Sequence, residues 1–256
     1  MKILTGHQHG KVWCDAFEAG ADDHGDLLLC WGWRWQREIK THIANGGRVC
    51  VLECGYLGDN LEWASASMGG RFKGHGMFPK AQDRGARFDK FFDLKPWSHS
   101  DGFTLILGQM PDHISLARVN GDLAEWYEAA AQMPDAVFRP HPRAPGTAYP
   151  PGTRTIIGRR EIGYSLARSL AGARVAVTFN SNAGVDAVLA GVPTIATDPG
   201  SMAWPVAAHS LSAPLVRPNR AKWAARLAWC QWTMDEMKSG AAWDALKTAE
   251  HWAARP

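Results

Sequence analysis

The regular alternation of apolar runs and helical patterns between residues 101 and 216 constrains the fold more than any other feature. Four short runs rich in β-branched residues are separated by segments with apolar residues at helical spacing. In order, the chain reads as strand "FTLILGQ" (103–109), helix "GDLAEWYEAAAQM" (121–133), strand "AVFRPHP" (136–142), helix "RREIGYSLARSLAGA" (159–173), strand "RVAVTFN" (174–180), helix "SNAGVDAVLAG" (181–191) and strand "VPTIATD" (192–198). Strands alternating with helices through short loops predict a doubly wound parallel α/β sheet.

The first hundred residues show one further βαβ pattern. Two apolar runs, 26–33 and 47–55, flank a helical segment at 34–46. Residues 66–97 follow without a clear period, and we expect a long functional loop there. A helix should begin at Asn219 and continue through the apolar positions 223, 227, 230 and 234, with a weaker helix at 241–249.

These patterns predict two Rossmann-like halves with a cleft between them. The expected boundaries are 1–100 for the N-terminal half and 101–218 for the C-terminal half. Residues 219–256 should form helices that pack across both halves. In open parallel sheets, ligands bind beyond the carboxyl ends of the strands.

Composition excludes several classes of protein. The net charge of +3 is too small to require nucleic acid, although it permits an anionic partner. Five cysteines without a C-x-x-C pair argue against disulfides and a zinc site and favour a reducing compartment. Because the sequence shows no secretory signal and no long apolar run, we expect a cytoplasmic protein without a membrane span.

Polar residues follow three successive strands of the predicted sheet. The first strand leads to Gln109, with Asp112 and Ser115 close behind. The second brings a group of basic side chains and the third a group of uncharged ones. These are Arg139, His141 and Arg143 after the second strand, and Asn180, Ser181 and Asn182 after the third. Since parallel strands end at one edge of a sheet, we expect a single site.

The segment after the third strand predicts a phosphate cradle. A helix beginning near Ser181 presents unpaired N–H groups, which hold phosphate together with the Ser181 hydroxyl and the Asn182 amide. Gly184 would allow a ligand to approach the backbone, and Asp186 could accept hydrogen bonds from sugar hydroxyls. The pattern therefore predicts a site for a nucleotide mono- or diphosphate.

A purely structural interpretation accounts for each of these residues taken alone. Ser181 or Asn182 could be a helix N-cap, and His141 could be an internal hydrogen-bonding group in a rigid turn. Asp112 could cap the next helix. The position of all three sets after successive strands favours the binding site.

Three segments, "LILGQMPDHISL", "AVFRPHP" and "VAVTFNSNAGVDAVLAGVPTIATDPGSMAW", resemble capsule-polysaccharide glycosyltransferases of the Kdo-transferase type. The resemblance covers about residues 103 to 204, and its HP motif is also similar to other GT-B enzymes. It implies a GT-B fold and a nucleotide-sugar donor as co-substrate, without a cofactor or metal. It further implies that His141 contacts a donor phosphate and that Asp186 stands where the family often has Glu.

The sequence, including "LECGYLGD" (52–59) and "LAWCQWTMDEMKSGAAW" (227–243), also looks like small glycosyltransferase-like proteins of bacteriophages, which would act in the host cytoplasm. In that setting the acceptor could be a hydroxymethylated base in DNA instead of a saccharide. Residues 71–92 suit DNA because basic and aromatic side chains interleave there. A solvated basic loop, with some Phe residues in the core, is the equal alternative. The candidate acceptor-binding residues are Arg71, Lys73, His75, Arg84 and Arg87.

The base that takes the acceptor proton should come from the N-terminal half. Glu53 ends an apolar strand and is the first candidate, followed by Asp59 and by His9. Two other functions stay open: a sugar-nucleotide epimerase or hydrolase on the same scaffold, and a non-catalytic nucleic-acid-binding accessory protein.

Overall fold

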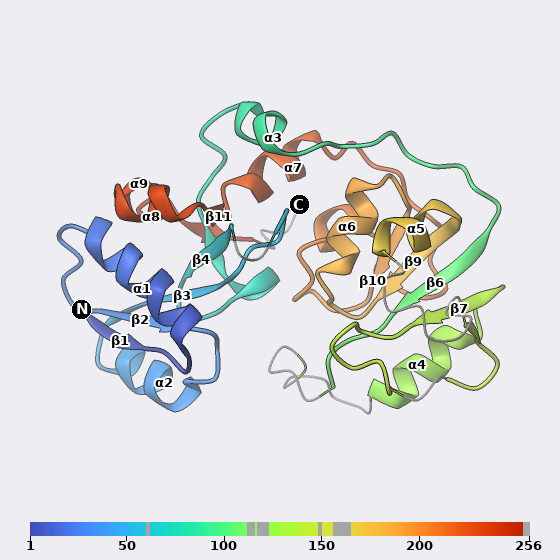
Figure 1. Ribbon diagram of the computed structural model, residues 1–256, viewed down its shortest axis with the longest axis horizontal. Helices are drawn as coiled ribbons and strands as arrows, with labels where there is room; N and C mark the ends of the chain where they lie inside the picture. The colour runs from blue at the N-terminus through green and yellow to red at the C-terminus, as the bar shows by residue number, and fades with distance from the viewer. Residues whose placement is uncertain (60–61, 112–115, 117–122, 148–149, 156–164, 253–256) are drawn as a thin grey trace. The chain divides into compact units, whose positions relative to one another are not determined.

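The computed structural model describes residues 1–59, 62–111, 116, 123–147, 150–155 and 165–252 (Figure 1). The chain divides into two compact units. Unit 1 comprises Met1–Phe92 together with Arg220–Pro256, and unit 2 comprises Asp93–Asn219. The predicted residue Asp112 and its neighbour Ser115 lie outside the described residues. Each unit contains its own sheet.

The sheet of unit 1 is mixed. Strands β1 (Lys2–Leu4), β2 (Leu27–Trp31) and β3 (Arg48–Cys54) are parallel neighbours. The remaining strands extend the sheet in antiparallel fashion in the order β3-β4-β5-β12, with β11 also on β4. These are β4 (Ala64–Met68), β5 (Met77–Phe78), β11 (Gln231–Trp232) and β12 (Glu250–His251).

Helices cover both faces of the parallel part of this sheet (Figure 1). On one face, α1 (Gln8–Gly20), α8 (Met234–Lys238) and α9 (Ala241–Leu246) form a core rich in tryptophan. Helix α2 (Gln36–Ala44) lies on the other face and buries Ile39. Because side chains alternate along a strand, neighbouring residues of β2 and β3 contribute to the two different faces.

Two expectations for unit 1 are wrong. Residues 66–97 are not one long loop, because they contain the end of β4, a 3₁₀ turn at Lys73–His75, β5, and α3 (Ala86–Phe91). The helix expected from Asn219 begins only at Ala221 and ends at Ala228, as α7. The next residues form β11 on β4, so strand pairing with a distant segment overrides the local helical period.

Unit 2 confirms the predicted parallel α/β sheet. All five strands run in parallel in the order β10-β9-β6-β7-β8. They are β6 (Phe103–Leu107), β7 (Ala136–Arg139), β8 (Arg154–Thr155), β9 (Ala173–Thr178) and β10 (Thr194–Ala196). Helix α4 (Leu123–Ala131) packs on one face, while α5 (Leu166–Ala171) and α6 (Ala183–Leu189) pack on the other. Gly172 is the C-cap of α5.

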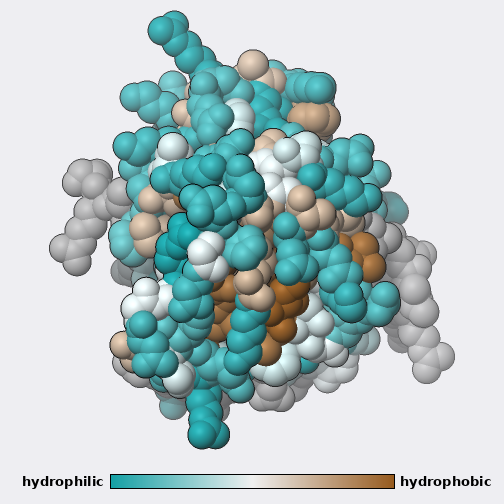
Figure 2. All heavy atoms as spheres, turned by 90° about the vertical axis from the view of Figure 1, so that its left-hand side faces the viewer, coloured by the Kyte–Doolittle hydropathy of each residue, from teal (hydrophilic) through white to brown (hydrophobic). Residues whose placement is uncertain are grey.

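Among the described residues, no helix is both long and apolar enough to cross a membrane. Figure 2 shows a mostly hydrophilic surface with a group of hydrophobic residues visible on one face. In the described part of unit 1, the large hydrophobic residues that are clearly exposed are Val12, Ile43 and Phe91.

Candidate functional site

The strand order of unit 2 creates a switch point between β6 and β9. From β6 the chain adds β7 and β8 on one side and then returns to add β9 and β10 on the other. In open parallel sheets, loops on the two sides of such a point diverge and leave a crevice for ligand. Gln109 and Asn180 are the second residues after β6 and β9, respectively, so two predicted site residues lie at this switch point.

The buried side chains of Gln109 and Asn180 bond to each other. Gln109 Nε2 donates to Asn180 Oδ1 at 3.0 Å, and Gln109 Oε1 accepts from the Asn180 backbone N–H at 3.3 Å. Asn180 Nδ2 donates to Asp198 Oδ1 at 3.2 Å, and the same oxygen accepts from Gly200 N at 2.7 Å. These amides therefore join the loops after β6, β9 and β10.

Two groups in this network escaped sequence analysis. Asp198 follows β10, so it has the same placement after a strand that pointed to the other site residues. Tyr127 of α4 accepts the Gln109 backbone N–H at 2.7 Å through its Oη. Burial raises the pKa of this phenol. Nothing in the local sequence distinguishes Tyr127 from the other aromatic residues of its helix.

Gly108 brings the loop after β7 next to the switch point. A Cβ on this residue would lie 2.8 Å from the Arg139 carbonyl oxygen and 2.9 Å from the His141 backbone nitrogen. Only a residue without a side chain allows this approach. The glycine in "LILGQ" therefore places His141 beside the segment that carries Gln109.

His141 is half-buried, and its Nδ1 accepts the backbone N–H of Arg143 at 3.2 Å. In the neutral imidazole this hydrogen bond leaves the proton on Nε2, where it can be donated to an anionic ligand. The side chain of Arg143 is exposed. Arg139 instead donates to Ser169 Oγ of α5 at 2.9 Å, and burial lowers its pKa. The Arg139 guanidinium is thus already hydrogen-bonded within unit 2, whereas the sequence predicts that it contacts nucleotide.

The turn between β9 and α6 is built by small polar groups. Ser181 N donates to Thr178 Oγ1 at 2.9 Å, and Ser181 Oγ accepts from Ala183 N at 3.3 Å. Asn182 is the N-cap by position, yet its side chain makes no capping bond. Its Oδ1 is buried without a hydrogen-bond partner in the described part of the chain. Ser181, not Asn182, therefore supplies the local capping interaction.

Gly184 and Asp186 differ in how well they match their predicted roles. A Cβ on Gly184 would lie 2.8 Å from Thr178 Cγ2, so this glycine lets α6 pack closely on β9. The expected close approach of a ligand is not its visible role. The Asp186 residue is exposed to solvent. Many protein atoms nevertheless surround its carboxyl group, and this desolvation raises its pKa to about 6.

The carboxyl ends of β1, β2 and β3 gather a second polar group in unit 1. The positions of two glycines show the proximity: a Cβ on Gly6 would lie 2.6 Å from Arg34 Nη1, and one on Gly32 would lie 3.4 Å from Glu53 Oε1. His9 packs edge-to-face on Trp31, with 5.2 Å between ring centroids. The structure thus brings these residues together at the carboxyl ends of β1, β2 and β3.

Glu53 lies within this group, near the end of β3. Burial raises the pKa of its carboxyl, while the charges of Lys73 and Arg34 and a backbone N–H lower it. The predicted Asp59 is exposed in the following loop, where its carbonyl accepts the N–H groups of Glu62 and Trp63. His7, next to His9, caps α1 by accepting Gly10 N at Nδ1.

The predicted acceptor-binding segment is used largely for packing. The aromatic residues Phe72, Phe78 and Phe88 are buried, so these rings cannot stack on an external base. Arg71 lies over the ring of Trp33, with 5.6 Å from its Cζ to the ring centroid. His75 is half-buried and Arg84 is exposed. The alternative of a basic segment with Phe residues in the core matches these positions.

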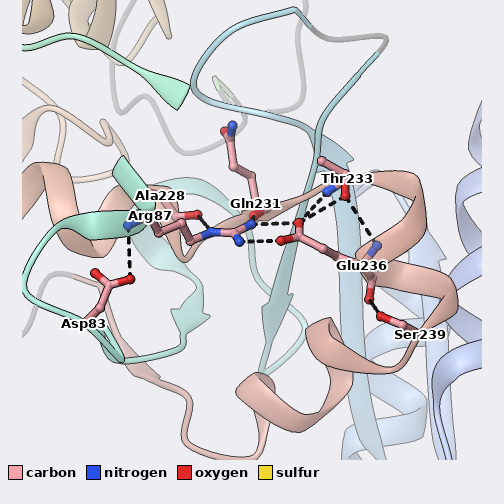
Figure 3. A network of polar contacts seen from close by, with 7 residues as sticks. All are labelled: Asp83, Arg87, Ala228, Gln231, Thr233, Glu236 and Ser239. Carbon is pink, nitrogen blue, oxygen red and sulfur yellow. Dashed lines mark hydrogen bonds and ion pairs between the residues drawn. The ribbon is translucent and has the colours of Figure 1, made fainter. Parts of the chain in front are cut away.

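Arg87 joins α3 to the C-terminal segment (Figure 3). Its guanidinium pairs with Glu236 and donates to the carbonyl oxygens of Ala228 and Gln231. It also lies over three tryptophan rings, those of Trp63, Trp229 and Trp232. The predicted role in acceptor binding is therefore replaced by an internal one, because these contacts occupy the guanidinium.

No protein-family model and no curated protein sequence matches the chain. Solved structures do. A β-Kdo 2,7 transferase of Thermosulfurimonas dismutans KpsC is 14% identical, with a TM-score of 0.58, and the match covers 96% of this chain and 99% of that one. The β-Kdo 2,4 transferase of the same KpsC is 12% identical, with a TM-score of 0.55 and coverage of 88% and 90%.

The chain has a glycosyltransferase-like Rossmann fold. This finding confirms the Rossmann-like α/β fold that the resemblance implied. At identities of 14% and 12%, the roles of individual residues cannot be transferred to this chain. Among the described residues, no group of three or more His, Cys, Asp or Glu could hold a metal ion. The chemistry available at the two strand edges thus consists of amides, hydroxyls, imidazoles, cations and carboxylates.

Proposed function

We propose that the chain is a GT-B-type glycosyltransferase that moves a sugar from a nucleotide-sugar donor to a hydroxyl acceptor. Unit 2 would bind the donor and unit 1 would supply the base. The observation that carries the proposal is the switch point of unit 2. There, Gln109, Asn180 and Asp198 fix the loops beside His141 and Ser181, in a fold otherwise found in Kdo transferases.

The leaving group is a nucleotide phosphate, and its negative charge must be stabilised as the glycosidic bond breaks. His141 can donate through Nε2, because its Nδ1 already accepts a backbone N–H. Ser181, Asn182 and Arg143 would add hydrogen bonds to phosphate. Asp186 is proposed to accept hydrogen bonds from sugar hydroxyls, and Gly184 keeps the helix that carries it close to β9.

The acceptor hydroxyl must lose a proton as it attacks the anomeric carbon. Glu53 is the proposed base, because it is a partly enclosed carboxylate at a strand end. His9 and Asp59 are the other candidates. We propose a saccharide acceptor in preference to a modified base in DNA, since three of the aromatic rings in residues 71–92, those of Phe72, Phe78 and Phe88, are buried and the Arg87 guanidinium is paired with Glu236.

A thermal-shift screen with UDP-, GDP-, CMP- and dTDP-sugars tests donor binding, because a ligand that binds the folded state raises the apparent Tm. We expect one nucleotide class to stabilise the protein. His141→Ala and Ser181→Ala should each weaken that nucleotide roughly tenfold, the effect of losing one hydrogen bond to a charged group. His99→Ala, at an exposed position of unit 2, is the control.

Unchanged affinity in both variants would refute the proposed donor site. Turnover assays then separate the reactions. Donor consumed only when a saccharide acceptor is present supports transfer, whereas donor consumed equally without acceptor indicates a hydrolase or an epimerase. Salt-sensitive binding to DNA without any nucleotide affinity would instead support an accessory nucleic-acid-binding protein.

A further inference from the structure

Glu53 lies on a crowded part of the β3–β4 pair. Its direct cross-strand partner is Ser65, and Ser65 Oγ donates to the Glu53 carbonyl at 3.4 Å. Directly opposite residues of antiparallel strands project to the same face. Gly32, with φ of 76°, follows β2 close to the Glu53 carboxylate, since a Cβ on it would lie 3.4 Å from Glu53 Oε1, an ordinary contact distance.

Lys73, in the 3₁₀ turn after β4, has a backbone conformation that lysine rarely adopts. Its φ is 50°, in the left-handed region. A non-glycine residue persists in this region only when its surroundings hold it there, and such residues concentrate at functional sites. Two hydrogen bonds hold it here: Lys73 N donates to Tyr56 Oη at 3.2 Å, and Gly76 N donates to the Lys73 carbonyl at 2.9 Å.

Tyr56 is itself fixed on both sides. The buried side chain of Gln231 accepts the backbone N–H groups of Tyr56 and Leu57 at 2.7 and 2.8 Å. Gln231 Nε2 also donates to the Leu57 carbonyl at 2.9 Å. The Tyr56 hydroxyl is hydrogen-bonded to the Ser65 side chain. Lys73 is therefore tied, through a single hydroxyl, to the cross-strand partner of Glu53.

The charges that face Glu53 come from two elements besides its own strand. Lys73 belongs to the 3₁₀ turn after β4 and is half-buried, whereas Arg34 follows β2 and is exposed. Tyr56 follows β3, and burial raises the pKa of its phenol, so it is neutral at physiological pH. Lys73 lowers the pKa of Glu53 more than Arg34 does, as expected for the less exposed cation.

We propose that Lys73 is a positioning residue for Glu53, held by Tyr56 so that its ammonium group keeps the Glu53 carboxylate ionised. This rests on the proposed function, in which ionised Glu53 accepts the proton of the acceptor hydroxyl. The sequence predicts that Lys73 contacts the acceptor, because it lies in a basic segment. In this proposal Lys73 acts on the base instead. Tyr56 and Gln231 supply the rigidity that a left-handed lysine requires.

The direct test is titration of Glu53 by NMR on protein labelled with ¹³C at glutamate side-chain carboxyls, with Glu53→Gln used to assign the signal. In Lys73→Met the titration midpoint of Glu53 should rise by about one pH unit, the effect of removing a nearby opposite charge. Lys73→Arg should keep most of the original midpoint. Tyr56→Phe removes the hydroxyl and should raise the midpoint in the same direction by a smaller amount.

Two further variants keep the test decisive. Lys73→Gly removes the ammonium without requiring a side chain in the left-handed region, so it should fold even if Lys73→Met does not, and it should give the same rise. Lys40→Met, at an exposed position of α2, removes one positive charge elsewhere in unit 1 and should leave the midpoint in place. A midpoint unchanged in both Lys73→Met and Lys73→Gly overturns the proposal.

The pH dependence of turnover separates this inference from the proposed function. If Glu53 is the base, the acidic limb of the rate profile should move upward together with its NMR midpoint in Lys73→Met. An NMR shift without a shift of that limb would support the action of Lys73 on Glu53 and refute Glu53 as the base. Rescue of both by Lys73→Arg supports an electrostatic role, since arginine restores the charge but not the shape.

Discussion

The two units present their strand ends with opposite chemistry. At the edge of unit 2, the buried side chains are amides: Gln109 and Asn180 bond to each other and to one carboxylate, Asp198. At the edge of unit 1, a carboxylate, Glu53, shares its surroundings with two cations, Lys73 and Arg34. Both edges are made by parallel strands followed by glycine-containing turns, so topology alone does not set their chemistry.

This contrast shows how a parallel sheet can serve two tasks. Uncharged amides that satisfy one another hold loops in place without changing charge between pH 5 and 8, which suits a site that presents backbone N–H groups to an anion. Burial raises the pKa of a carboxylate and a nearby cation lowers it, so the balance of the two can set a pKa that suits proton transfer. The edge of unit 2 thus suits ligand binding by fixed loops, and the edge of unit 1 suits proton transfer by a carboxylate.

The edges also differ in where their support comes from. The three residues of the amide network in unit 2 all come from one continuous stretch of chain, 109–198. In unit 1, the loop after β3 is held by Gln231, which follows in sequence only after the whole of unit 2. The order of the Glu53 region therefore depends on how firmly the C-terminal segment is attached, and Arg87 contributes to that attachment beside the pairing of β11 with β4.

Arg87→Ala should have the largest effect on stability. It removes a guanidinium that pairs with Glu236, bonds two carbonyl oxygens and lies over three tryptophan rings (Figure 3). Glu236 and the two carbonyl oxygens lose their donor in a partly buried site, which costs about 2–3 kcal/mol of unfolding free energy. Urea denaturation followed by tryptophan fluorescence measures the loss. Arg84→Ala, at an exposed position nearby, should change it by no more than about 0.5 kcal/mol.

The same variant sharpens the comparison when amide exchange is followed by mass spectrometry. In Arg87→Ala, peptides from residues 220–252 and from the loop after β3 should lose protection first. Peptides from β6 and β9 should keep theirs, because their network lies within unit 2. Equal loss of protection in both units would contradict the view that only the edge of unit 1 depends on the C-terminal segment.

Asn180→Ala should have an intermediate effect. It leaves Gln109 Nε2 without its acceptor and removes one donor from Asp198, and a buried polar group without a partner costs about 1–3 kcal/mol. Affinity for the stabilising nucleotide should fall with it, because the loops after β9 and β10 lose their connection. Isothermal calorimetry and urea denaturation measure the two effects.

Gln132→Ala is the matched control, since this exposed amide only bonds the preceding turn of its helix. If Asn180→Ala bound nucleotide as tightly as the unmodified protein, the amide network would be structural only. The donor site would then depend on His141 and Ser181 alone. A loss of affinity larger than the loss of stability would instead assign Asn180 a direct contact with ligand.

Much of unit 2 could be predicted from sequence because its signals are local. β-Branched runs, helical spacing and the glycines at positions 108, 172 and 191 indicate strands, helices and their ends without reference to distant residues. The polar residues after each strand were found for the same reason. Asp198 also follows a strand, so the same criterion applied to β10 would have found it.

Unit 1 was harder to predict because its structure depends on pairing over long separations. β11 exists because Gln231 and Trp232 meet β4 more than 160 residues earlier in the chain, and no local pattern encodes that partner. Arg87 looked like a ligand contact because its partners, Glu236 and three tryptophans, are mostly distant in sequence. Tyr56 and Gln231 were missed for the same reason.

Asp186→Asn should have the smallest effect, and its pH dependence tests whether the Asp186 carboxyl of unit 2 titrates with a raised pKa. Desolvation raises the pKa of Asp186 from 3.8 to about 6 in the folded protein. The folded state therefore binds its proton more tightly than the unfolded state does, so ionised Asp186 destabilises the fold above about pH 6, and this penalty disappears as the pH falls toward 3.8. Asp186→Asn should raise the Tm at pH 7 and leave it nearly unchanged at pH 4.

The expected rise in Tm is on the order of 1 °C, because Asp186 is exposed and solvent screens most of the effect. Differential scanning calorimetry between pH 4 and pH 8 can resolve it. A rise of equal size at both ends of this range would show that the asparagine acts through shape or hydrogen bonding. A rise confined to the neutral range would show that the Asp186 carboxyl titrates with a raised pKa, so that a desolvated carboxylate occurs in unit 2 as well as in unit 1.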